Sequence, residues 1–191
     1  MPKALEKKKI INLPNGLTSL RLICIPLVAV CLSRPGKFIN FLAALFFSIA
    51  FITDFLDGYF ARKYDEVTVF GKFLDPLADK ILVTVTMIML IPLGRIPTWI
   101  VILIITREMA ITGMRSIAVS QGIVIQAGIL GKYKTVFQAV SLICLCLYYE
   151  YLGLDFYSMG IPLLWVALFM TLWSGVRYFL QFNKIFVASS K

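Results

Sequence analysis

The chain has 191 residues, of which 60% are hydrophobic, and it carries a net charge of +9. Soluble domains are about 45–50% apolar, so the composition predicts an integral membrane protein, and the length predicts a single domain over residues 1–191. The absence of His excludes His-based catalytic triads and zinc sites that require His. Because the basic residues stand at the ends of apolar runs, the positive charge favours lipid headgroups and phosphorylated substrates over nucleic acid as partners.

Six apolar segments follow one another along the chain. A basic segment at residues 3–11 precedes them, and we expect it to lie along the lipid headgroups as a short interfacial segment. Only the last of the six has an uninterrupted uncharged core of the about 20 residues that a membrane span needs, and the others reach that length by including charged ends. We therefore expect an all-α membrane protein with six transmembrane helices, at residues 18–33, 38–62, 71–94, 97–121, 132–149 and 156–179.

The distribution of Lys and Arg predicts the orientation of these spans. If both termini face the cytoplasm, only Arg34, Lys37 and Arg95 of the 19 basic residues fall on the outer side. Cytoplasmic loops carry the excess of Lys and Arg in membrane proteins. This asymmetry predicts a cytoplasmic location for both termini and for the ends of the spans that hold most of the charge.

Four aspartates interrupt the second and third expected spans, in the pattern Asp54-x-x-Asp57-Gly58-x-x-Ala61-Arg62-x8-Gly71-x3-Asp75-x3-Asp79. At helical spacing each pair shares one face of its helix. Aspartates at this spacing usually form a solvated face in a soluble protein. Here, however, they adjoin the uncharged runs 38–53 and 81–94, and ionisable groups in that setting mark a functional site.

The two pairs of carboxylates also match in depth. At about 1.5 Å per residue, Asp54 and Asp57 lie roughly 24 and 28 Å from the outer end of their span, and Asp79 and Asp75 come to nearly the same depths. Four carboxylates so close would repel one another without cations between them, and a ligand set of oxygens alone suits Mg²⁺ or Mn²⁺. Two such cations can clamp a pyrophosphate during displacement at phosphorus. A cation site at headgroup depth suits a substrate with phosphates and acyl tails.

The pattern from Asp54 to Asp79 resembles the signature of the CDP-alcohol phosphotransferase (phosphatidyltransferase) family. Segments on either side resemble the bacterial phosphatidylglycerophosphate synthases within that family, and the likeness covers most of residues 12–138. The resemblance implies six membrane helices, two divalent cations (Mg²⁺ or Mn²⁺), a homodimer and a multi-pass location in the bacterial cytoplasmic (inner) membrane. The flanking segments are Asn12-Leu13-Pro14-Asn15-x-Leu17-Thr18-x-x-Arg21, Arg107-Glu108-Met109-x-x-Thr112-Gly113-x-Arg115 and Gly131-Lys132-x-Lys134-Thr135.

The resemblance also implies a reaction, in which the phosphatidyl group of CDP-diacylglycerol passes to glycerol 3-phosphate, and phosphatidylglycerophosphate and CMP are formed. Asp54, Asp57 and Asp75 are then expected to hold the metals, with Asp79 near both and acting as the general base. The positions that the family uses for the nucleotide, or that could close its pocket from the first span, are Asn15, Thr18, Gly58, Ala61, Arg62 and Thr68.

Three basic residues are candidates for the phosphate of the acceptor. Arg107 and Arg115 lie well inside an apolar segment, and Lys134 lies nearer to its boundary. The guanidinium group of Arg offers a planar fork to phosphate oxygens. The alternative for each residue is an anchor at the lipid headgroups, of the kind that the positive-inside rule describes.

Other functions remain open at this point. Within the family the acceptor could instead be serine, inositol or phosphatidylglycerol, although several basic residues near the site favour an acceptor with its own phosphate. A divalent-cation transporter would use the aspartates as a relay, but it predicts a site near mid-membrane between repeated halves, and the two halves of this chain do not resemble each other. A structural scaffold has no use for four matched acids.

Overall fold

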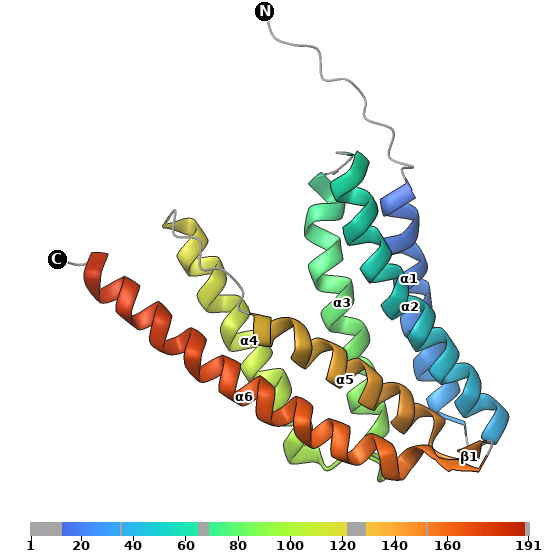
Figure 1. Cartoon of the computed structure of the whole chain (residues 1–191). Helices are drawn as coiled ribbons and strands as arrows, with labels where there is room; N and C mark the ends of the chain where they lie inside the picture. The colour runs from blue at the N-terminus through green and yellow to red at the C-terminus, as the bar shows by residue number, and fades with distance from the viewer. Residues whose placement is uncertain (1–12, 35, 65–68, 122–128, 152, 190–191) are drawn as a thin grey trace, which may run out of the picture. The chain divides into compact units, whose positions relative to one another are not determined.

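The structure is a computed structural model that describes residues 13–34, 36–64, 69–121, 129–151 and 153–189. These residues form six α-helices and one two-stranded hairpin, which confirms the all-α prediction (Figure 1). The expected interfacial segment at residues 3–11 lies outside the described residues. The helices are α1 (Leu13–Leu32), α2 (Lys37–Tyr64), α3 (Val69–Leu90), α4 (Thr98–Ser120), α5 (Ile129–Leu147) and α6 (Phe156–Ser189), and the strands are β1 (Glu150–Tyr151) and β2 (Leu154–Asp155).

Several helix ends differ from the expected ones. Helix α1 begins at Leu13 instead of residue 18, because Pro14 falls in the first turn, where its missing N–H costs little. Helix α3 ends at Leu90 instead of Gly94. Pro92 cannot continue a helix, and Gly94 adopts a left-handed φ of 69° that glycine tolerates best. Helix α6 continues ten residues past its apolar core, to Ser189.

The helices fall into two compact units, one up to residue 89 and one from residue 90 onward. In the first unit α1 packs against α2. The packed face of α1 repeats every four residues at Cys24, Val28 and Leu32, which is the helical spacing. Helix α2 supplies Phe47 and several buried alanines, and such small residues let two helix backbones approach closely.

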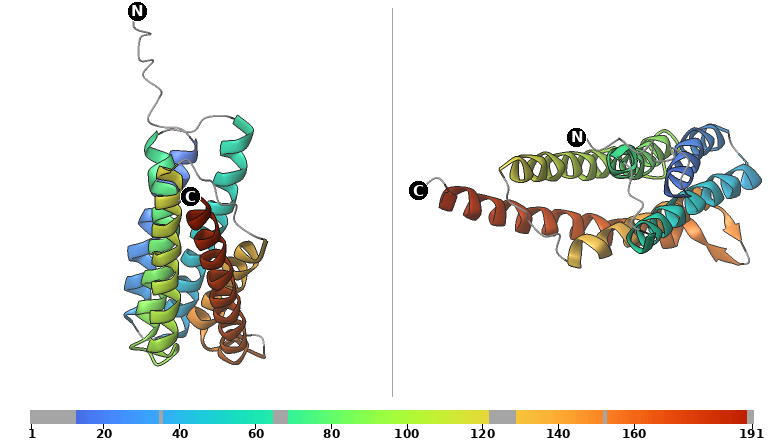
Figure 2. Two further views of the ribbon diagram at one scale, coloured as in Figure 1. Left: turned by 90° about the vertical axis from the view of Figure 1, so that its left-hand side faces the viewer. Right: turned by 90° about the horizontal axis from the view of Figure 1, so that it is seen from above.

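In the second unit α6 packs against both α4 and α5 (Figure 2). The contact between α5 and α6 is tightest at Gly160, where an added Cβ would lie only 2.9 Å from Cγ of Leu145. Ser141 on α5 donates a hydrogen bond to the carbonyl oxygen of Gly160 at 2.9 Å. The buried core of this unit includes Ile100, Ile104, Leu142, Leu145, Leu164 and Ala167.

Arg95 fastens the loop between α3 and α4 to the end of α5. It is only 5% exposed, and its Nη1 donates to the carbonyl oxygens of Leu145 at 3.0 Å and Cys146 at 3.1 Å. These carbonyls belong to the last turn of α5, where carbonyl oxygens have no hydrogen-bond partner within the helix. The guanidinium also lies 4.2 Å from the ring centroid of Tyr148. Burial lowers the pKa of Arg95, yet an Arg stays charged in proteins.

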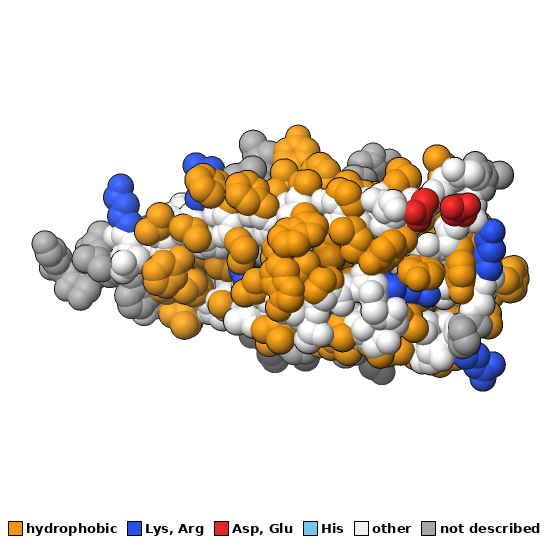
Figure 3. Space-filling view, turned by 90° about the horizontal axis from the view of Figure 1, so that it is seen from below, with side chains coloured by type: hydrophobic (Ala, Val, Ile, Leu, Met, Phe, Trp, Pro, Cys, Tyr) orange, Lys and Arg blue, Asp and Glu red, His pale blue; other side chains and the backbone are white. Residues whose placement is uncertain are grey.

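The surface of the helices is apolar. In the described part of the chain, one helix, Phe156–Lys184, is long and apolar enough to cross a membrane, and only 33% of its apolar window is buried. The core helix of a soluble protein would be mostly buried, so this exposed apolar surface suits contact with lipid. Hydrophobic side chains dominate the face drawn in Figure 3, with few charges among them. Shorter apolar helices are Ser19–Leu32, Lys37–Thr53 and Tyr133–Leu147.

Candidate active site

The four aspartates lie on two continuous helices of the first unit. Asp54 and Asp57 come ten and seven residues before the end of α2 at Tyr64, and Asp75 and Asp79 come six and ten residues after the start of α3 at Val69. The helix ends are joined by four residues, a link that spans at most about 18 Å. At about 1.5 Å per residue, each pair therefore begins about 10 Å from the linked ends. Counted from these linked ends, the two pairs come at similar distances along their helices, while the match in depth that was predicted from the outer ends stays a prediction, since α3 ends at Leu90 and not at Gly94.

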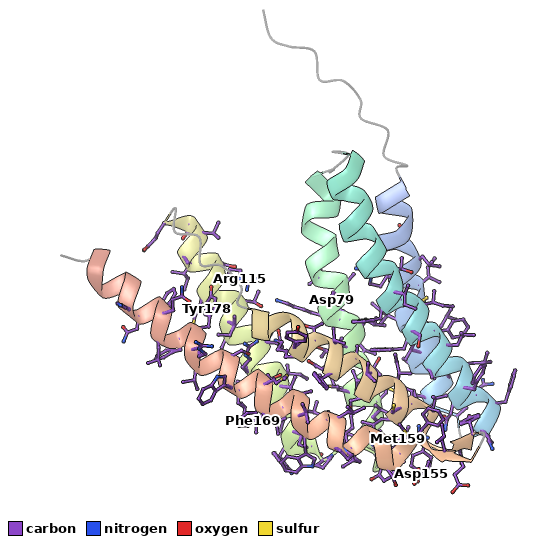
Figure 4. The ribbon with its side chains drawn as sticks, viewed as in Figure 1. Asp79, Arg115, Asp155, Met159, Phe169 and Tyr178 are labelled. Atoms are coloured by element: carbon purple, nitrogen blue, oxygen red, sulfur yellow. The ribbon has the colours of Figure 1, made fainter. Side chains whose placement is uncertain are left out.

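The side chains of Asp54, Asp57 and Asp75 lie outside the described part of the structure. Asp79 is described and is half-buried on α3, next to the fully buried Ala78 (Figure 4). Among the described side chains, no group of three or more His, Cys, Asp or Glu residues comes together. The donor set itself consists of carboxylate oxygens on two helices of one unit, and such a set fits Mg²⁺ or Mn²⁺.

The residues expected to contact the nucleotide are placed by their backbone only. Gly58, Ala61 and Arg62 lie on α2, four to eight residues after Asp54, and Asn15 and Thr18 lie near the start of α1. Their side-chain surroundings lie outside the described part of the structure, as does Thr68 altogether. Their roles stay predictions.

Arg21 has a place in the fold that the sequence analysis did not assign. This α1 residue is fully buried, with an exposed fraction of 0%, in the unit that also holds the four aspartates. A buried guanidinium is costly unless negative charge compensates it. The signal in the sequence was an Arg spaced three and seven residues before the buried Cys24 and Val28, on the face of α1 that packs inward.

In the second unit, Glu108 of α4 brings two of the predicted phosphate-binding residues together. Its Oε1 accepts a hydrogen bond from Nη1 of Arg107 at 3.2 Å and another from Nζ of Lys134 on α5. Lys134 is buried, and the side chains of Arg107 and Glu108 are largely buried. The sequence analysis named Arg107 and Lys134 but did not foresee that Glu108 would link them. A headgroup anchor would be more exposed than Lys134 is.

Helix α6 completes the surroundings of these cations. Nη2 of Arg107 donates to Oγ of Ser174 at 2.8 Å. Arg115, two turns after Arg107 on α4, holds its guanidinium carbon 5.9 Å from the ring centroid of the buried Tyr178 (Figure 4). Neither Ser174 nor Tyr178 was predicted, because the last apolar segment matches no motif that the sequence analysis recognised.

We call Arg107, Glu108, Arg115 and Lys134 the cation cluster. It holds three cations and one carboxylate, so positive charge is in excess. Such a group suits an anion with several oxygens, such as a phosphate or a carboxylate. The cavity beside Arg107, of 290 Å³, is otherwise lined by hydrophobic side chains and Gly175.

Comparisons with known proteins identify the family. Residues 11–173 match the CDP-alcohol phosphatidyltransferase family. The chain belongs to this family. It is 40% identical over 183 residues to a CDP-diacylglycerol–glycerol-3-phosphate 3-phosphatidyltransferase of Bacillus subtilis (strain 168). The match covers 88% of this chain and 93% of the relative.

Two further relatives carry related names. A CDP-diacylglycerol–glycerol-3-phosphate 3-phosphatidyltransferase of Rickettsia bellii (strain RML369-C) is 38% identical over 92% of this chain and 97% of its own length. A probable phosphatidylglycerophosphate synthase of Mycobacterium tuberculosis (strain CDC 1551 / Oshkosh) is 37% identical over 90% of this chain and 82% of its own length. The CDP-alcohol phosphatidyltransferase matches confirm the resemblance seen in the sequence.

Proposed function

We propose that the chain transfers the phosphatidyl group of CDP-diacylglycerol to glycerol 3-phosphate and forms phosphatidylglycerophosphate and CMP. The family membership supports the donor and the reaction type. The names of the relatives support the acceptor. The observation that carries the proposal within this chain is the cation cluster, in which the buried Lys134 and the largely buried Arg107 share one carboxylate and Arg115 adds a third, exposed cation, because such an excess of positive charge favours an anionic substrate.

The cation cluster favours glycerol 3-phosphate over acceptors that carry no phosphate or a more weakly charged one. Arg107, Arg115 and Lys134 are proposed to bind its phosphate. Only two N–H groups of Arg107 have partners among the described residues, and its buried Nε has none there, whereas a guanidinium offers five N–H donors. Serine and inositol bring no phosphate to such a site, and phosphatidylglycerol brings a more weakly charged one.

The aspartates are proposed to hold two divalent cations, Mg²⁺ or Mn²⁺, with Asp54, Asp57, Asp75 and Asp79 as ligands. Cations held there would neutralise the negative charge of the pyrophosphate and of the departing CMP. Asp79 is proposed to take the proton of the acceptor hydroxyl, whose oxygen then forms a bond to the phosphorus attached to diacylglycerol. The bond from that phosphorus to the oxygen of CMP breaks, and the electron pair leaves with CMP.

The small residues and the polar residues near the aspartates are proposed to receive the nucleotide. Gly58 and Ala61 leave space for it beside the backbone of α2. Arg62 and Thr68 are proposed to contact the CDP group, and Asn15 and Thr18 to close the pocket from α1. A basic residue and hydroxyl or amide groups can donate hydrogen bonds to the oxygens of the phosphates and of cytosine.

The placement in the membrane is proposed from the sequence pattern and the apolar surface. All six helices would cross a bacterial cytoplasmic (inner) membrane, with both termini and the site on the cytoplasmic side. The length of α6 and the exposed hydrophobic side chains on every helix support this. Membrane lipids would then surround the helices, and we propose that the enzyme works as a homodimer, as the family resemblance implies.

A single assay tests the function. The purified chain in detergent receives CDP-diacylglycerol, Mg²⁺ or Mn²⁺, and glycerol 3-phosphate, serine, inositol or phosphatidylglycerol in turn, and CMP release is measured. We expect release with glycerol 3-phosphate alone. Release with another alcohol alone would assign a different acceptor. No release with any alcohol, together with cation uptake into vesicles that contain the protein, would favour a transporter and refute the enzyme.

A further inference from the structure

We propose that one face of α6 positions the arginines that bind the acceptor phosphate. We call this face the α6 stripe and define it as Thr171, Ser174, Gly175 and Tyr178. Its members follow the spacing of three, four and seven residues that places side chains on one side of a helix. The proposal rests on the proposed function. It adds positioning residues in a stretch that mostly lies beyond the family match, which ends at residue 173.

Ser174 fixes the direction of the Arg107 guanidinium. Its Oγ accepts the bond from Nη2 of Arg107 and donates to the carbonyl oxygen of Thr171 at 3.1 Å. The second bond orients the hydroxyl so that its lone pairs face Arg107. An Arg side chain has several rotatable bonds and loses much entropy when it binds a ligand. A partner that already holds the guanidinium in place reduces that loss.

Gly175 gives the Arg107 side chain room to lie flat against α6. A Cβ added at Gly175 would come within 3.0 Å of Nε and 3.2 Å of Cγ of Arg107. Any larger residue would therefore push the middle of this side chain away from α6. The bond to Ser174 would lengthen as a result, since both contacts involve adjacent residues of the same helix.

Tyr178 supports Arg115 in a similar way. Its ring lies under the guanidinium of Arg115 at 5.9 Å, a distance at which a cation and an aromatic face still attract. Tyr178 is 8% exposed, and its buried hydroxyl has no hydrogen-bond partner among the described residues. Buried hydroxyl groups are normally paired. A phosphate oxygen bound by the cation cluster would supply the missing acceptor.

The test measures the Michaelis constants of the purified full-length chain in detergent. We expect Ser174→Ala to raise the KM for glycerol 3-phosphate by about tenfold, the size expected for one hydrogen bond to a charged group. The kcat and the KM for CDP-diacylglycerol should stay near the wild-type values. Ser174→Thr keeps the hydroxyl and should restore the KM. Ser120→Ala is the matched control, because Ser120 is exposed and its hydroxyl donates to the carbonyl oxygen of Ile117 in its own helix.

A double-mutant cycle separates positioning from general packing. In an Arg107→Ala background, Ser174→Ala should leave the KM for glycerol 3-phosphate unchanged, because the residue through which it acts is gone. A further increase in that background would overturn the proposal. So would a Ser174→Ala variant that lowers thermal stability while its KM stays at the wild-type value.

The failure of this proposal can be told apart from the failure of the proposed function. A wild-type chain that releases no CMP with glycerol 3-phosphate refutes both. If the wild type is active and Arg107→Ala raises the KM, but Ser174→Ala and Gly175→Ala do not, the acceptor site stands and only the role of the α6 stripe is refuted.

Discussion

The four aspartates of α2 and α3 all carry a carboxylate, but we propose two different roles for them. Asp54, Asp57 and Asp75 are proposed to act only as cation ligands, whereas Asp79 is also proposed to take the proton from the acceptor. A carboxylate can serve as this base because nearby cations make the incoming hydroxyl more acidic. Replacing either kind of residue by Asn keeps the size and removes the charge, so the two roles can be separated by experiment.

We expect Asp79→Asn to lower the catalytic rate more strongly than it lowers the affinity for the metal. Its kcat should fall about a thousandfold, within the range for loss of a general base, while Mn²⁺ binding weakens less than in Asp57→Asn. Mn²⁺ affinity from electron paramagnetic resonance and CMP release from the same preparations measure both. Glu150→Gln, which removes an exposed acid in the hairpin, is the control. An Asp79→Asn enzyme with normal turnover refutes the assignment of the base.

Single residues also show where sequence reasoning reached its limit. The spacing of the aspartates and the motif around Arg107 were sufficient to nominate the charged residues. Ser174 was missed as a partner of Arg107, and Lys134 as a partner of Glu108, because a contact between two helices depends on how the helices pack, and no pattern within one segment records it. Gly175 was missed for the same reason, because its role depends on the Arg107 side chain that packs against it.

At the scale of elements, apolar runs predicted all six helices but not their ends. A hydropathy pattern reports the apolar core of a span, whereas a helix ends where its backbone hydrogen bonds stop. Helix α6 therefore continues beyond residue 179, to Ser189. The short hairpin β1–β2 was not predicted, because its two-residue strands carry no alternation that could be recognised.

Asp155 caps the start of α6, and this predicts a dependence on pH. Its Oδ1 accepts hydrogen bonds from the backbone N–H groups of Tyr157 and Ser158, and its Oδ2 accepts one from the hydroxyl of Ser158. The hydrogen bonds from Ser158, and then the one from Tyr157, lower the pKa of Asp155 below its ordinary 3.8. Because the pKa is lower in the folded state, Asp155 stabilises the fold fully at a pH above the pKa of its unfolded state. This stabilisation is lost as the pH falls through the pKa of the folded state.

The variant Asp155→Asn tests this cap. At pH 6 the wild type should melt at the higher temperature, because the ionised carboxylate accepts three bonds and favours the positive end of the helix. The difference should shrink toward zero as the pH is lowered from 4 to below the pKa of Asp155. Glu150→Gln, in the same hairpin, is the matched removal of an exposed charge. If the wild type and Asp155→Asn differ in melting temperature by the same amount at pH 6 and pH 3, the ionisation of Asp155 does not contribute to stability and this prediction is contradicted.

The close contact of α5 and α6 predicts a second effect on stability. Gly160→Ala puts a methyl group 2.9 Å from Cγ of Leu145 and 3.1 Å from Cβ of Cys144, and overpacking of this kind costs about 1–3 kcal/mol. Gly113→Ala is the control, since an added Cβ there meets nothing within 4 Å and should be neutral or stabilising. Thermal unfolding in detergent compares them. Equal melting temperatures for the two variants would show that α5 and α6 are not packed this closely.

At the scale of the whole molecule, two groups of charge are divided between the two units. The aspartates belong to α2 and α3 of the first unit, and the cation cluster belongs to α4 and α5 of the second. A transfer between a metal-bound nucleotide and a phosphate-bearing acceptor needs one group of each sign. A transporter's ion path has no need of the proposed anion site, so the presence of both groups in one chain favours the proposed reaction.

The most direct test of the central claim is an experimental structure with Mn²⁺, in which anomalous scattering locates the ions. We predict two peaks between α2 and α3, with carboxylate oxygens from both helices within coordination distance of about 2.0–2.2 Å. Asp54, Asp57, Asp75 and Asp79 should all contribute. Carboxylates that point apart, or peaks that only one of the two helices contacts, would contradict the shared cation site and with it the proposed mechanism.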